Sequence, residues 1–164
     1  MKNVTVVFTS GGGNWLGTEL GDGAMLKQKI HQLCISAKGF PDPVADPEMK
    51  HVMGTDPRAR VFLMQQEGAE NWLCDQLSAI AERLEELQAE DESCILHVAV
   101  RCRGGFQRSV AIAEILAALL RKKLSDQPIM VAHLTLLLVL AVRQLHFGVN
   151  KGDSLSLDDT VHEV

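Results

Sequence analysis

The stretch from residue 94 to residue 124 most constrains how this chain folds. Cys94 to Val100 is a continuous apolar run of strand length, which is typical of a strand buried in a parallel sheet. A short loop with two glycines follows, and Arg108 to Leu124 then places apolar residues at helical spacing. Parallel strands need a crossover, usually a helix, so this order predicts an α/β fold. We expect a single α/β domain with a mostly parallel sheet and helices on both faces.

Further strands and a long helix are predicted around this unit. Val4 to Phe8 is a short β-branched strand that runs into a glycine-rich loop, Thr9 to Asn14. Ile30 to Lys38 and Pro128 to His133 are also predicted as strands. Ala69 to Ala89 carries apolar residues three and four positions apart and is predicted as an amphipathic helix.

Two Asp-Pro pairs predict helix starts, because aspartate caps a helix and proline fits its first position. They are Asp46-Pro47 and Asp56-Pro57. The apolar run from Thr135 to Leu145 either extends the last strand or forms a helix. Residues 1–149 are expected to form the domain, and residues 150–164 a loose polar tail.

Composition narrows the function classes. The 164 residues include 16 Lys and Arg against 21 Asp and Glu, a formal charge of -5, which disfavours nonspecific binding of nucleic acid. The longest apolar run, Leu136 to Val142, is far shorter than the ~20 residues of a membrane-spanning helix. The four cysteines form no C-x-x-C pair, and no signal peptide is apparent at the N-terminus. We expect a cytoplasmic protein with no membrane partner, metal or cofactor.

The glycine loop between the strand and the helix is the main candidate site. Glycines let backbone N–H groups turn toward one point, and the dipole at a helix start favours an anion there. Arginine adds a fork that matches phosphate oxygens, and serine adds a hydroxyl. The alternative is a plain tight turn whose arginine pairs with a surface acid. The loop predicts a phosphate site with these ligand-binding candidates: Arg103, Gly104, Gly105, Gln107, Arg108 and Ser109.

Other candidates come from neighbouring strand ends. The segment 10–12 can supply further amides across the sheet crevice, although a plain strand-to-loop turn is the alternative. Two lysines are candidate phosphate partners, although lysines are more often solvated. His97 lies within an apolar strand and is predicted to be a satisfied core histidine. The additional ligand-binding candidates are Ser10, Gly11, Gly12, Lys38, Lys50 and His133.

Cys102 opens a second hypothesis. Cysteine, five residues, arginine and serine is the loop spacing of cysteine-dependent phosphatases, in which a thiolate attacks phosphorus. Such an enzyme also needs a general acid, for which Asp42 and Asp46 are the candidates. The alternative is that Cys102 is a small buried residue at a strand end.

Two separated motifs in the chain point to one known family. The first is the stretch from Cys102 to Glu114, and the second is Phe40-Pro41-Asp42-Pro43 with Gly54 to Pro57 after it. The first resembles the C-G-G-R-S-V-A-E signature of the C-terminal domain of the RapZ family of RNase adapter proteins, and the second resembles that family's leucine-proline-asparagine-proline segment and following turn. The resemblance covers most of Val4 to His133.

The resemblance implies an α/β domain that binds an amino-sugar phosphate and a small regulatory RNA and works as a homo-oligomer. The family is not regarded as a phosphatase group, so the resemblance favours binding over catalysis by Cys102. In the bacterial adapters the domain follows a nucleotide-binding domain, but this sequence has no Walker motif, so ATP hydrolysis is not expected. The family's basic tail is replaced by residues 134–164, which argues against RNA binding. In this tail the acidic residues outnumber the basic ones: Asp153, Asp158, Asp159 and Glu163 against Arg143 and Lys151.

Overall fold

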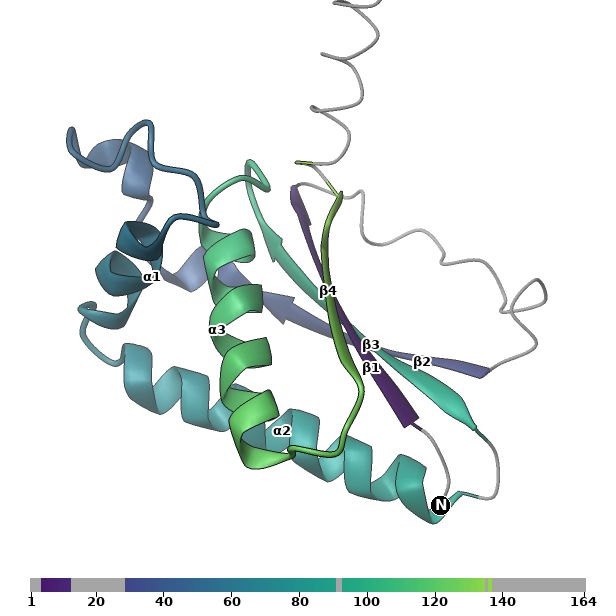
Figure 1. Ribbon diagram of the computed structural model, residues 1–164. Helices are drawn as coiled ribbons and strands as arrows, with labels where there is room; N and C mark the ends of the chain where they lie inside the picture. Colours follow the sequence, from purple (N-terminus) through teal and green to yellow (C-terminus); the bar gives the residue numbers. More distant parts are fainter. Residues whose placement is uncertain (1–3, 13–28, 91–92, 135, 137–164) are drawn as a thin grey trace, which may run out of the picture.

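The structure is a computed structural model that describes residues 4–12, 29–90, 93–134 and 136. Within these residues the chain forms four strands, three α-helices and two 3-10 turns, which Figure 1 draws in space. Their order is β1 (Val4–Gly12), β2 (Lys29–Ser36), η1 (Ala37–Gly39), η2 (Pro43–Ala45), α1 (Pro57–Met64), α2 (Ala69–Ala89), β3 (Cys94–Cys102), α3 (Arg108–Lys123) and β4 (Ile129–His133). The predicted α/β domain is confirmed.

The described strands form one parallel sheet in the order β2-β3-β1-β4. Val6 of β1 pairs with Leu96 of β3 on one side and with Ile129 of β4 on the other. The moves from β2 to β3 and from β3 to β4 run in the same direction across the sheet. Because parallel crossovers are right-handed, α2 and α3 belong on the same face.

The core lies between that face and the helices. Alternate residues of β1, Val4, Val6 and Phe8, are at most 1% exposed, and Leu96 and Val98 of β3 are fully buried beside them. This alternation follows from the two-residue period of a strand. All three described α-helices lie on one side of the sheet (Figure 1), so helices on the second face stay a prediction.

The two Asp-Pro pairs behave differently. Asp56 caps α1 by accepting the N–H of Arg58 at 2.9 Å, and Pro57 takes the first helical position. The Arg58 side chain, which also donates to this carboxylate, lowers the pKa of Asp56 from 3.8 to about 2. The predicted helix after Asp46-Pro47 is wrong, because residues 47–51 form turns.

Strand limits also differ from those predicted. β1 continues through Gly12, so Ser10, Gly11 and Gly12 pair with β3 and are not part of a loop. β2 ends at Ser36, whose side chain caps η1, and this places Lys38 in η1 beyond the strand. The predictions for residues 135–145 and 150–164 lie almost entirely outside the described residues.

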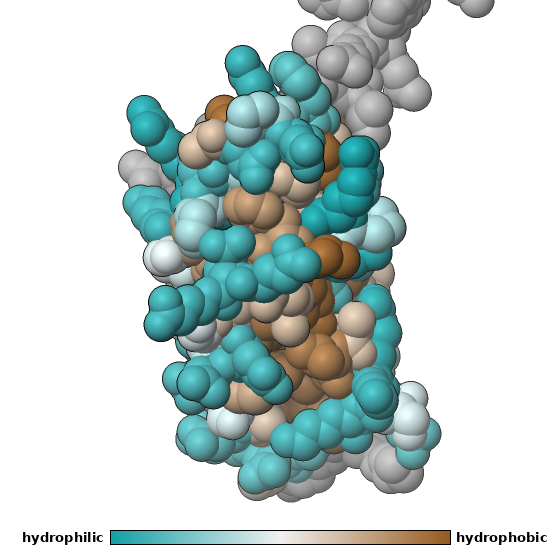
Figure 2. Space-filling model, turned by 90° about the vertical axis from the view of Figure 1, so that its left-hand side faces the viewer, coloured by the Kyte–Doolittle hydropathy of each residue, from teal (hydrophilic) through white to brown (hydrophobic). Residues whose placement is uncertain are grey.

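The helical side of the molecule exposes apolar surface. Figure 2 views this side and shows apolar side chains gathered among hydrophilic ones. Val61 and Met64 of α1 and Leu119 of α3 are large apolar side chains that remain 54%, 43% and 38% exposed. Among the described helices, none has the length and apolar character needed to cross a membrane.

Candidate functional site

The carboxyl ends of β1 and β3 lie where the strand order reverses. After β1 the chain next enters the sheet at β2, on one side, whereas after β3 it next enters at β4, on the other. Ligands in open α/β sheets bind in the crevice at such a reversal. The glycine loop after β3 therefore lies at the position where the fold favours a binding site.

Two glycine segments are in direct contact there. Gly12 pairs with Cys102 at the ends of their strands. A Cβ atom added to Gly12 would lie 2.7 Å from the carbonyl oxygen of Gly104 and 3.0 Å from the backbone nitrogen of Gly105. Such contacts are too short for any side chain, so only glycine allows the two backbones to approach. The structure thus brings together the segments 10–12 and 104–105 that the sequence singled out.

Cys102 and Ser109 support the loop from beneath. The Cys102 sulfur accepts the N–H of Gly105 at 3.1 Å and lies 3.2 Å from Ser109 Oγ. Cys102 is 3% exposed and Ser109 is fully buried. Incoming phosphorus can reach so buried a sulfur only if the loop moves. Catalysis by Cys102 stays a prediction.

The Arg108 guanidinium contacts a different segment. Its Nη1 donates to the carbonyl oxygen of Phe40 at 2.9 Å, and its Nη2 donates to Asp42 Oδ2 at 3.1 Å. The Arg108 side chain is 10% exposed and that of Asp42 is 46% exposed. Arg108 therefore joins α3 to residues 40–54, which we call the proline segment.

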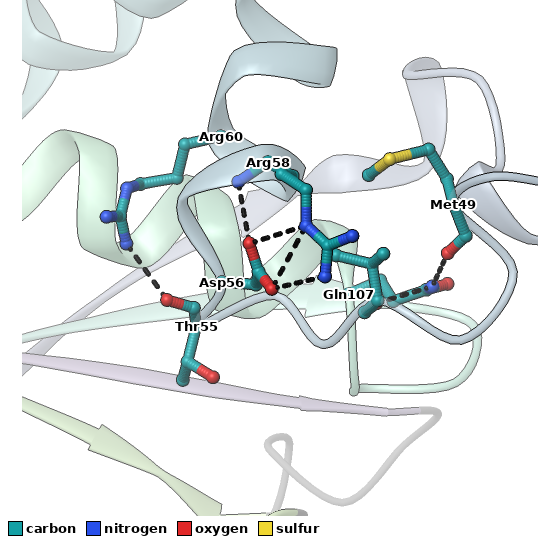
Figure 3. A network of polar contacts seen from close by, with 7 residues as sticks. Met49, Thr55, Asp56, Arg58, Arg60 and Gln107 are labelled. Atoms are coloured by element: carbon teal, nitrogen blue, oxygen red, sulfur yellow. Dashed lines mark hydrogen bonds and ion pairs between the residues drawn. The ribbon is translucent and has the colours of Figure 1, made fainter.

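Gln107 and Gly54 fasten the same segment to the loop. Gln107 Nε2 donates to the carbonyl oxygens of Met49 at 2.9 Å and Val52 at 2.8 Å, and Figure 3 shows the first of these contacts. The N–H of Gly54 donates to the carbonyl oxygen of Phe106 at 2.9 Å. The carbonyl oxygens of Met49 and Val52 lie where a helix was predicted after Asp46. They accept hydrogen bonds from the distant Gln107 side chain, and not from the backbone of a helix. Gln107, predicted as a ligand-binding residue, thus has two protein acceptors.

The remaining cationic candidates are exposed. Arg103 directly precedes Gly104, so its place in the sequence puts it at the rim of the loop. Lys38 lies in η1, after the carboxyl end of β2, and Lys50 lies in a turn of the proline segment. Their role in ligand binding stays a prediction. Among the described residues, no three His, Cys, Asp or Glu side chains gather in a way that could hold a metal ion.

A hydrogen-bonded chain links β1, β4 and α3 on the core side of the sheet. Ser10 Oγ lies 2.8 Å from His133 Nδ1, and His133 Nε2 lies 2.9 Å from Glu114 Oε1. Ser10 is fully buried. The sequence suggested His133 but not its partners. One feature of the sequence could have indicated a role for Glu114. It is an isolated acidic residue in α3 between the apolar residues Ala113 and Ile115, both of which are buried.

His97 is confirmed as a satisfied core histidine. Its Nε2 lies 2.7 Å from Thr9 Oγ1, and the residue is 4% exposed. Burial lowers the pKa of His97, and the nearby charge of Arg101 lowers it further. The neutral ring is therefore the form that the fold accommodates.

This burial predicts a pH dependence of stability. Because the pKa of His97 is lower in the folded chain, the unfolded chain binds more protons and stability falls as pH drops below about 6.5. From pH 7.5 to 5.5, wild type should lose roughly 1 kcal/mol more unfolding free energy than His97→Gln, measured by urea denaturation. The exposed His51, changed to Gln, should leave the wild-type slope unaltered. Equal slopes for wild type and His97→Gln would contradict the assignment.

Comparison with known proteins identifies the family. The RapZ C-terminal domain matches residues 24–136, a range that includes β2, β3, β4, the three helices and the glycine loop. The resemblance inferred from the two motifs is thereby confirmed.

Several relatives are named as nucleotide-binding proteins. One from Anaeromyxobacter dehalogenans (strain 2CP-C) is 34% identical over 132 residues, 79% of this chain and 44% of that protein. One from Leifsonia xyli subsp. xyli is 39% identical over 89 residues, 54% of this chain and 30% of the relative. One from Pediococcus pentosaceus is 36% identical over 91 residues, 56% of this chain and 30% of the relative. The chain thus spans less than half the length of each relative.

Proposed function

Because this chain belongs to the RapZ C-terminal domain family, we propose that it binds a phosphorylated small molecule where β1, β3 and α3 meet. In this proposal Gly104 and the first turn of α3 supply backbone N–H groups to the phosphate, and Arg103 supplies a positive charge at the rim. Gly105 shapes the loop, since its own N–H is donated to the Cys102 sulfur. The segment 10–12 of β1 forms the opposite wall. Binding serves a regulatory or adapter role.

The contact between Gly12 and the loop is the observation that carries this proposal. The end of β1 approaches the backbone of the glycine loop so closely only because Gly12 carries no side chain, and this places two stretches of backbone without side-chain bulk beside the proposed site. The start of the 16-residue helix α3 follows directly and adds its dipole. These features support a phosphate-sized ligand despite the overall charge of -5.

We propose two ligand classes that share a phosphate group. The relatives are named as nucleotide-binding proteins, which supports a nucleotide, and the resemblance to the adapters supports an amino-sugar phosphate. Both ligands present a phosphate to the loop. Binding of RNA and assembly into a homo-oligomer stay predictions, as does a cytoplasmic location.

Ligand-dependent stabilisation tests the proposal. Inorganic phosphate, a nucleoside monophosphate and an amino-sugar phosphate should each raise the melting temperature of the wild-type protein, since a ligand at 100 times its Kd adds about 2.7 kcal/mol. Arg103→Ala should weaken inorganic phosphate binding roughly threefold to tenfold, because one charge-assisted contact is lost. Isothermal titration calorimetry measures this change.

Lys122→Ala is the matched control, because Lys122 is an exposed cation in the last turn of α3, at the opposite end from the loop. It should bind phosphate as wild type does. The proposed function fails if none of the three ligands binds, and the proposed position fails if both variants lose the same affinity.

A further inference from the structure

The Arg108 guanidinium already has an anionic partner inside the protein. Arg108 is 8% exposed, and its carboxylate partner comes from Asp42, 66 residues earlier in the chain. Arg108 is the first residue of α3 and directly follows the loop that we propose as the phosphate site. The arginine that directly follows the proposed phosphate site therefore already has its charge balanced by a carboxylate.

The two hydrogen bonds of Arg108 are not equivalent. Nη1 donates to the backbone oxygen of Phe40, which is fixed by the fold and carries no charge. Nη2 donates to a carboxylate that is half exposed and can return to water at little cost. A guanidinium has five N–H donors, so Nη1 can hold the side chain in place while Nη2 exchanges its acceptor.

We propose that the Asp42 carboxylate is an internal competitor of the ligand: it occupies Arg108 in the free protein and is displaced when phosphate binds. Asp42 thereby lowers the affinity of the site and sets the phosphate concentration at which it fills. This inference rests on the proposed function, since it assigns a regulatory residue to the same site.

Asp42→Asn isolates the charge from the rest of the side chain. Asp42 Oδ1 also accepts the N–H of Val44 at 3.3 Å and so caps η2. An asparagine carbonyl oxygen can accept the same bond, and asparagine is as good a cap as aspartate. The substitution therefore removes the competing anion while it leaves the local backbone contact in place.

Affinity for inorganic phosphate, measured by titration calorimetry on the full chain, tests this inference. Asp42→Asn should bind phosphate roughly threefold to tenfold more tightly than wild type, because phosphate no longer displaces an ion pair. Glu48→Gln removes the same charge from an exposed position in the same segment and should change the affinity less than twofold. The melting temperature without phosphate is recorded for each variant, because a merely structural ion pair would lower that temperature and leave the affinity unchanged.

A double-mutant cycle with Arg108→Lys identifies the group that Asp42 occupies. Lysine lacks the second planar donor, so the gain from Asp42→Asn should fall below twofold in the Arg108→Lys background. The inference is overturned if Asp42→Asn binds phosphate no better than wild type, or if the gain is equal in both backgrounds. If no variant and no wild-type protein binds phosphate, the proposed function itself fails, and this inference fails with it.

Discussion

Gly54→Ala should lower the free energy of unfolding by about 3 kcal/mol. A Cβ atom at this position would lie 2.3 Å from the carbonyl oxygen of Gln107 and 2.6 Å from Val110 Cβ, both at the start of α3. The alanine methyl can fit only if the proline segment moves away from the loop, which breaks the hydrogen bond from Gly54 to Phe106. Urea denaturation followed by circular dichroism measures the loss.

Gly39→Ala provides the matched control for this prediction. Gly39 ends η1 and directly precedes the proline segment, whereas Gly54 is the last residue of that segment. No heavy atom lies within 4 Å of a Cβ added to Gly39. Its unfolding free energy should stay within about 0.5 kcal/mol of wild type. If Gly54→Ala is as stable as Gly39→Ala, the close packing of the proline segment on α3 is wrong.

The sequence was most informative where a single element determines its own structure. The apolar run at Cys94 and the helical spacing after Arg108 predicted β3 and α3 to within two residues, because burial of a whole strand and of one helix face leaves a periodic pattern. The same pattern predicted α2 from Ala69 to Ala89. The parallel sheet then followed from the alternation of strands and helices.

Prediction failed where tertiary hydrogen bonds replaced local ones. Asp46-Pro47 has the composition of a helix start, and the Asp46 carboxylate does accept the N–H of Glu48 as a cap would. Turns form nonetheless, because Met49 and Val52 are buried and their carbonyl oxygens accept hydrogen bonds from Gln107. No local pattern around residue 46 records a donor that is almost sixty residues away.

In the candidate site, too, features determined by local sequence were predicted and features determined by tertiary contacts were not. The glycine loop was predicted as a candidate site from its place between a strand and a helix, where glycines can turn amides toward the helix start. The sequence left open that Arg108 pairs with a surface acid, but it did not identify Asp42, and it offered no partner for His133. Asp42 and Glu114 come from other elements and meet these residues only after the crossovers have formed. Long-range pairs of this kind fix the positions of the side chains around the candidate site. They can be identified only from the three-dimensional structure.

Gly12→Ala should have the second large effect, on stability and on binding together. The added methyl would meet backbone atoms of Gly104 and Gly105 at 2.7 to 3.0 Å, and backbone cannot rotate aside as a flexible side chain can. We expect a loss of 2 to 3 kcal/mol in unfolding free energy, roughly, as the strand end and the loop separate. If the proposed site is correct, affinity for inorganic phosphate should fall at least roughly tenfold, because the loop would lose the geometry proposed to hold the anion.

Gly104→Ala separates the steric cause from the mere loss of a glycine. An added Cβ at Gly104 meets only a ring carbon of Phe106, at the ordinary distance of 3.6 Å. The unfolding free energy of this variant should therefore lie within about 0.5 kcal/mol of wild type or slightly above it, since replacing glycine reduces the entropy of the unfolded chain. Comparable destabilisation by the two alanines would mean that β1 and the loop are not in contact, and the binding site proposed between them would lose its wall.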